Sequence, residues 1–133
     1  MERIAIAKVS LLPDKRLAVY PAQASASYQY VYREACEVYW DNEDGFFFSP
    51  VPRQWDYKRW YGQIVSVVLS GLGIRLSQTE DTSFLPDDPD FVTDMRNAEH
   101  DVQHWIDVER PKIMEAEQTR GELQSERRGR LPL

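Results

Sequence analysis

Residues 28–61 read YQYVYREACEVYWDNEDGFFFSPVPRQWDYKRWY and hold twelve of the sixteen aromatic residues of the chain. Each aromatic side chain covers roughly 150 to 250 Å², so this stretch carries more ring surface than one modest sheet and its helix can readily bury. Tyr and Trp suit half-wet pockets and interfaces because their polar tips can face water. We therefore expect some of these rings to line a cleft or a subunit contact, while the same spacing also fits rings that simply form the core.

The first half of this stretch predicts β-structure. Every second residue from Tyr28 to Tyr32 is a tyrosine, which is the period of a strand. Residues 33–40 fit both a strand and one face of a helix, and we favour a strand for the second half. Residues 37–40 and 46–49 flank the turn-rich segment Asp41–Gly45, which predicts a β-hairpin.

The second half predicts a helix. Asp56 is a suitable N-cap for residues 57–70, in which Trp60, Ile64 and Val67 lie at helical spacing. Gly71 or Gly73 would end this helix.

Outside the aromatic stretch the same alternation of strand and helix signals continues. Residues 3–12 and 16–20 predict a second β-hairpin, and residues 74–76 resume a β-like character before a polar segment leads away. Pro89 follows Asp88, which is a start signal for the longest helix. Pro111 should kink or end that helix.

These elements predict an α+β fold, with an antiparallel sheet of about four to five strands and two main helices packed on one face. We expect a single domain over residues 1–124 and a flexible C-terminal tail over residues 125–133. The composition, with 42% hydrophobic and 29% charged residues, is that of an ordinary globular protein.

Charge and cysteine content exclude several classes of protein. The net charge is −6, and residues 76–116 alone carry eleven Asp or Glu against three Lys or Arg. Such an acidic segment repels phosphate backbones, so we expect no nucleic-acid partner. No apolar run is long enough to span a bilayer, and a single cysteine, Cys36, allows no intramolecular disulfide. We expect a soluble cytoplasmic protein with no membrane partner.

Two histidines, His100 and His104, stand at i and i+4 as in zinc-binding helices, with Asp101 where such helices carry Glu. A catalytic zinc also needs a third protein ligand, and no third His or Cys lies at ligand spacing. The helix from Pro89 carries an apolar stripe at helical spacing, made up of Phe91, Met95, Ala98, Val102 and Ile106 and continued by Glu109. The helical period places both histidines opposite this stripe, so they should be exposed. We expect no metal and no cofactor. Cys36 lies between Glu34 and Glu37, which disfavour a reactive thiolate.

Five segments resemble small uncharacterised bacterial proteins carried on integron gene cassettes. They are RIAIAKVS at residues 3–10, YVYREA at 30–35, YWD at 39–41, PRQW at 52–55 and WY at 60–61. The resemblance spans residues 3–76 and implies a compact α+β domain of unknown function that often self-associates. It carries over no catalytic residue.

Three functions fit these observations. The first is a binding or interaction domain, encoded on a mobile gene cassette, whose aromatic cleft takes a small apolar or aromatic molecule or a peptide. The residues expected to bind this ligand are Tyr30, Tyr32, Tyr39, Trp40, Trp55 and Trp60. The second is a small enzyme that uses a carboxylate, Glu34 or Glu37, with a tyrosine as acid and base. The third is an acidic immunity or antitoxin-like protein. We expect a homodimer.

Overall fold

The computed structural model describes residues 2–34, 37–50, 56–113 and 115. The elements follow in the order β1 (Glu2–Leu11), β2 (Leu17–Pro21), the 3-10 helix η1 (Ala26–Glu34), β3 (Tyr39–Asp41), β4 (Phe46–Phe48), α1 (Tyr57–Leu72), β5 (Ile74–Leu85), α2 (Pro89–His104) and the π-helical η2 (Trp105–Glu109). They fall into two units, and the first unit, residues 1–102, contains the whole sheet and α1.

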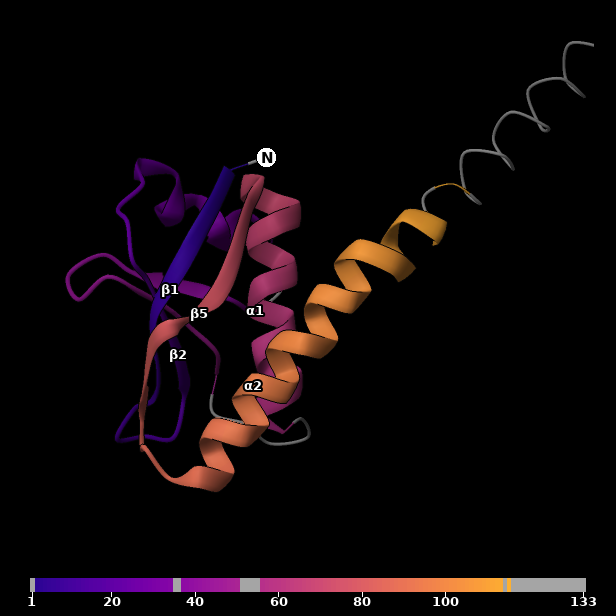
Figure 1. Cartoon of the computed structure of the whole chain (residues 1–133). Helices are drawn as coiled ribbons and strands as arrows, with labels where there is room; N and C mark the ends of the chain where they lie inside the picture. The colour runs from indigo at the N-terminus through magenta and orange to yellow at the C-terminus, as the bar shows by residue number, and fades with distance from the viewer. Residues whose placement is uncertain (1, 35–36, 51–55, 114, 116–133) are drawn as a thin grey trace, which may run out of the picture. The chain divides into compact units, whose positions relative to one another are not determined.

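The sheet has five strands in the order β3-β4-β2-β1-β5. Three of the neighbouring pairs are antiparallel, and β1 and β5 run parallel. Figure 1 shows β1 and β5 side by side, with α1 next to them and running in the opposite direction. The predicted α+β class, with a sheet of about four to five strands and two main helices, is confirmed, and the sheet is mostly antiparallel.

Both predicted β-hairpins are present. In the first, Leu12 N–H donates to Arg16 O (2.9 Å) and Lys15 N–H donates to Leu12 O (2.8 Å), with Lys15 at a φ of 71°. In the second, β3 and β4 are joined by a turn in which Gly45 has a φ of 76°, a backbone conformation that glycine adopts without steric cost. Oδ1 of Asp41 accepts hydrogen bonds from the N–H groups of Glu43 and Asp44 and so fixes this turn.

Helix α1 begins and ends at the predicted signals. The carboxylate of Asp56 accepts a hydrogen bond from Arg59 N–H (2.8 Å), which is the N-cap contact. Gly73 ends the helix in the left-handed conformation, with a φ of 68°, and its N–H donates to Leu69 O (3.0 Å). The helix packs on η1, β5 and β2, and its buried side chains include Ile64 and Val68.

The strand predicted over residues 28–32 is wrong, because the segment is part of the 3-10 helix η1. A 3-10 helix has three residues per turn, so residues i and i+3 lie on the same side. Tyr28 and Val31 are both buried, whereas Tyr30 is exposed. The buried residues of this segment therefore recur every three positions. The strand was predicted because the tyrosines recur every two.

Strand β5 is longer than the sequence predicted. Residues 77–83 were expected to lead away from the sheet, but β5 continues through them to Leu85 in parallel pairing with β1. The register is irregular, since Ile6 pairs with Gln78 while Lys8 pairs with Ser83. The buried Thr82 bridges this irregularity, because its hydroxyl donates to Ile6 O (2.6 Å).

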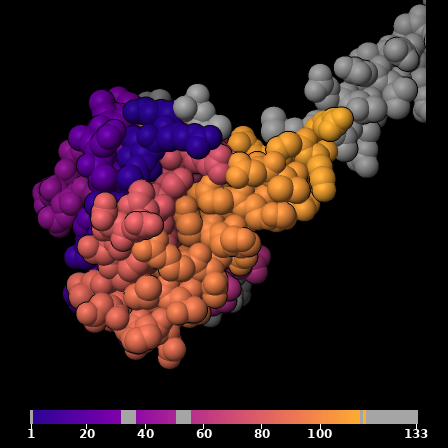
Figure 2. Space-filling model, viewed as in Figure 1, coloured from indigo at the N-terminus to yellow at the C-terminus, as the bar shows by residue number. Residues whose placement is uncertain are grey.

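Helix α2 begins at Pro89 as predicted, with Asp88 Oδ1 accepting from Asp90 N–H (2.8 Å). The members of the predicted stripe that lie in α2 are buried, namely Phe91, Met95, Ala98 and Val102. Ile106 in η2 is buried too, whereas Glu109 is exposed. The helix contacts β5, the edge strand of the sheet, where Gln78 Nε2 donates to Met95 O (2.9 Å) and Arg96 Nη1 donates to Thr79 O (2.9 Å). The atoms of β5 and α2 meet along this edge in the space-filling view, where they are salmon and orange (Figure 2).

Pro111 was expected to kink or end the long helix, and it does not end it, because helical backbone continues to Ile113. The preceding turns are π-helical, and Arg110 N–H donates to Trp105 O, five residues back. A proline ring clashes with the carbonyl four residues before it in a regular α-helix and offers no N–H. The wider π-helical turns allow the chain to remain helical through the proline.

Candidate functional site

Three rings from three elements form a cluster on the inner face of the sheet. Trp40 on β3 and Phe47 on β4 are cross-strand partners, so their side chains lie on the same face, with ring centroids 4.8 Å apart. Tyr28 on η1 packs on both, at 4.8 Å from Trp40 and 5.1 Å from Phe47. Tyr28 and Phe47 are fully buried, whereas Trp40 is only half-buried. One ring of the cluster therefore remains accessible.

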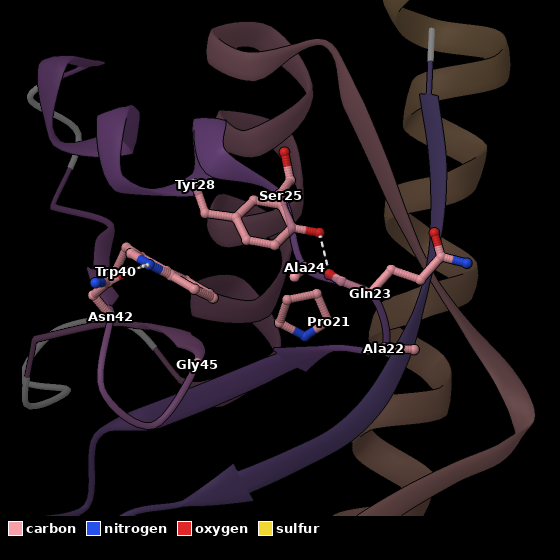
Figure 3. Close-up of a pocket in the computed structure, with 9 residues that line it drawn as sticks. All are labelled: Pro21, Ala22, Gln23, Ala24, Ser25, Tyr28, Trp40, Asn42 and Gly45. Carbon is pink, nitrogen blue, oxygen red and sulfur yellow. Dashed lines mark hydrogen bonds between the residues drawn. The ribbon is translucent and has the colours of Figure 1, made fainter.

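A pocket of about 300 Å³ opens beside this accessible ring. Its described lining residues are Pro21, Ala22, Gln23, Ala24, Ser25, Tyr28, Trp40, Asn42 and Gly45. Figure 3 shows the indole of Trp40 directed toward Pro21 and Ala24, and the side chain of Gln23 extending away from the rings. The volume is at the lower end of the range for small-molecule sites.

The polar tips of the pocket rings are bonded within the protein. The Tyr28 hydroxyl donates to Gln23 O (2.7 Å), which anchors the loop to the ring. Trp40 Nε1 donates to Asn42 Oδ1 (3.3 Å). Burial, and then the negative charge of Glu2, raise the pKa of Tyr28 to about 12. Tyr28 is therefore neutral and a hydrogen-bond donor at physiological pH.

A second set of rings lies on the opposite face of the sheet, and we call it the outer aromatic row. It consists of Tyr20, Phe46, Phe48 and Tyr39, with successive ring centroids 4.9, 5.7 and 5.4 Å apart. Tyr39 and Trp40 are neighbours in β3, so their side chains point to opposite faces.

Charged groups flank the outer aromatic row. Lys8 Nζ lies 5.2 Å from the Tyr20 ring centroid, and the Arg16 guanidinium lies 5.6 Å from that of Phe48. Burial raises the pKa of Tyr20, and the carboxylates of Asp44 and Asp41 raise it further. The row thus has both positive and negative neighbours.

The six residues expected to bind a ligand are distributed over different environments. Trp40 lines the pocket. Tyr39 lies in the outer aromatic row and Tyr30 lies on η1, and these two tyrosines are each 41% exposed. Trp60 is a buried residue of α1. The side chain of Tyr32 and the whole of Trp55 lie outside the described residues.

The sequence reading missed most of the pocket. Tyr28 was assigned to a strand, and none of residues 21–25 was named as a binding residue. The available signal was the pair Ser25 and Ser27 before the tyrosines, because serine side chains favour a turn or helix start. In the structure Ser27 N–H donates to Ser25 Oγ (3.3 Å) just ahead of Tyr28.

The carboxylates named for an acid-base role do not form a described pair with a tyrosine. Glu37 is exposed, and the side chain of Glu34 lies outside the described residues. Among the described residues, Tyr61 and Glu99 form a tyrosine–carboxylate pair. Burial, and then Glu99, raise the pKa of Tyr61 well above its usual value. Tyr61 is fully buried, and both oxygens of Glu99 accept hydrogen bonds. The pair therefore joins α1, α2 and β5.

His100 and His104 are exposed, as the helical period predicted. His100 Nδ1 lies 3.7 Å from Asp101 Oδ1, and His104 Nε2 lies 3.8 Å from Glu109 Oε1. Among the residues that the structure describes, no three His, Cys, Asp or Glu side chains come together as a metal ion would require. Cys36 lies outside the described residues. Within the same ranges, no helix has the length and apolar character needed to cross a membrane.

The fold and the site define a small α+β domain with an aromatic pocket beside the sheet. Residues 3–82 match the family Integron Cassette Protein Hfx_Cass5, and the chain belongs to this family, as the sequence resemblance implied. It is also similar to a solved integron cassette protein, Hfx_Cass5, from the mobile metagenome of the North West Arm sewage outfall. The identity is 28%, over 75% of this chain and 98% of that one, with a TM-score of 0.36. No curated protein matches the chain.

Proposed function

We propose that this cassette protein is a binding domain that takes a small apolar or aromatic molecule, or the side chain of a peptide, in the pocket beside Trp40. The single observation that carries this proposal is a half-buried indole facing a cavity of about 300 Å³. Small-molecule sites are concave and are lined by rings together with a few polar groups. The lining here has that composition.

The pocket is also held in shape before any ligand arrives. Phe47 supports Trp40 from behind, and Tyr28 packs on both rings while its hydroxyl holds the loop at Gln23. A ligand would therefore meet an ordered wall, and little conformational entropy would be lost on binding.

The test uses two adjacent residues that point to opposite faces of the sheet. Small neutral and charged aromatic fragments are screened by NMR against the wild-type chain, a Trp40→Leu variant and a Tyr39→Leu variant. The expected result is binding that is lost in Trp40→Leu and kept in Tyr39→Leu. A denaturation curve of each variant confirms that it is folded. Fragments that bind equally to both variants, or no binding to the wild-type chain, would contradict the proposal.

We also propose that the chain forms a homodimer through the outer aromatic row. In a two-fold dimer the same surface of both copies forms the contact, and a row of rings on a sheet face can pack against its own copy. Asp41 and Asp44 act on Tyr20 at one end of the row, where Lys8 also lies, and Arg16 lies over Phe48 toward the other end. A two-fold axis can therefore bring Arg16 of one copy to the carboxylates of the other. Sedimentation velocity should show a dimer that dissociates in Tyr39→Arg and persists in Trp40→Leu. A monomeric wild-type chain would refute this second proposal.

A further inference from the structure

The described lining of the pocket carries no charged side chain. Among the described residues, the charges assigned to its surroundings are negative: Glu2 raises the pKa of Tyr28, and the turn that supplies Asn42 and Gly45 also contains Asp41 and Asp44. These charges repel an anion. A cation would gain from the ring faces, but it would leave water without a carboxylate in the lining to pair with it. Taking an unpaired charge out of water is costly for either sign.

The size of the pocket limits the ligand further. A cavity of about 150 Å³ is known to hold one benzene ring, and the pocket beside Trp40 has about 300 Å³. One ring or two fused rings therefore fit. A larger ring system would exceed this volume.

The polar groups on the rings do not offer strong recognition of a polar ligand. Trp40 Nε1–H is already donated to Asn42 Oδ1, and the Tyr28 hydroxyl hydrogen to Gln23 O. The Ser25 hydroxyl is engaged with that of Ser27 (2.9 Å). A ligand thus meets mainly ring and aliphatic surface, which recognises it by stacking and by shape.

We infer that the ligand of this pocket is an uncharged planar molecule of one or two rings, stacked on Trp40. This inference rests on the proposed function and names the class of ligand for the same site. The inference excludes phosphates, carboxylates and ammonium groups as the part of the ligand that enters this pocket.

Three probes of nearly equal shape test the inference at pH 7. They are naphthalene-1-carboxamide, which is neutral, 1-naphthoate, which is an anion, and 1-naphthylmethylammonium, which is a cation. The indole N–H signal of Trp40 reports binding in NMR titrations, and Trp40→Leu serves as the control. We expect the carboxamide to bind at least tenfold more tightly than either charged probe.

The outcomes separate the two proposals. If a charged probe binds at Trp40 as tightly as the carboxamide, the inference of an uncharged ligand is wrong while the proposed function stands. If fragments from the screen bind at Trp40 but the carboxamide does not, the inferred ligand class is wrong. If no compound moves the Trp40 signal, the proposed function fails and the inference fails with it.

Discussion

The hydroxyl of Tyr61 on α1 donates a hydrogen bond to Oε2 of Glu99 on α2. Oε1 of the same carboxylate accepts the backbone N–H of Gln78 on β5 (3.0 Å). Because β5 is an edge strand, this N–H has no neighbouring strand on its outer side to bond with. One carboxylate therefore satisfies a strand edge and joins both main helices to the sheet.

This relationship predicts a large effect of removing one hydroxyl. Tyr61→Phe leaves a partly buried carboxylate without one of its donors, and hydrogen bonds to charged groups contribute about 1.5 to 3 kcal/mol. We expect the free energy of unfolding, measured in urea, to fall by about 2 kcal/mol. Tyr57→Phe is the matched control, since its exposed hydroxyl donates to the uncharged backbone carbonyl of Lys15 (3.3 Å). Equal losses in the two variants would show that the contact with Glu99 contributes nothing special.

Alkaline pH should weaken the fold through Tyr28. Its pKa in the folded chain is about 12, against 10.0 ordinarily, so the unfolded chain loses this proton first as the pH rises. The contribution to stability is complete below pH 10.0 and is lost between pH 10.0 and about 12. Urea midpoints measured across this range should fall less steeply in Tyr28→Phe than in the wild-type chain. The same slope in both would mean that Tyr28 keeps an ordinary pKa when folded.

The parts of the fold that the sequence predicted well are those set by local chemistry. Asp56, Gly73 and Pro89 mark the helix ends, because capping and left-handed conformations depend on a few neighbouring residues. The segment η1 could not be predicted in this way. Its helical form depends on burying Tyr28 against Trp40 and Phe47, which are brought there by the β3–β4 hairpin.

The candidate site was predicted in part for the same reason. Trp40 was named because a tryptophan in an aromatic stretch suits a half-buried position, and it does line the pocket. The facing wall is the loop at residues 21–25, whose small residues carry no chemical signal of binding. That wall exists because the Tyr28 hydroxyl bonds to Gln23 O, a contact that no residue spacing reveals.

The N-cap of α1 offers a direct test of local stabilisation. Asp56→Ala removes the acceptor for Arg59 N–H, and loss of an N-cap costs about 1 kcal/mol. Asp56→Asn keeps an oxygen acceptor in the same place and should cost only a few tenths of that. Chemical denaturation of the two variants checks the difference. If both variants lose the same amount, the carboxylate acts through its charge and the hydrogen bond is unimportant.

We expect a substitution of Thr82 to weaken the parallel β1–β5 pair more than other single substitutions. Its buried hydroxyl donates to Ile6 O (2.6 Å) and accepts from Thr79 N–H (2.8 Å), where the register of the two strands is interrupted. Thr82→Val keeps the shape but leaves both backbone groups without this partner, which we expect to cost about 2 kcal/mol. Thr82→Ser retains the hydroxyl and should lose less than half as much in the same urea measurement. Hydrogen exchange at Thr79 should also accelerate in the valine variant alone, and unchanged exchange there would show that another group satisfies this N–H.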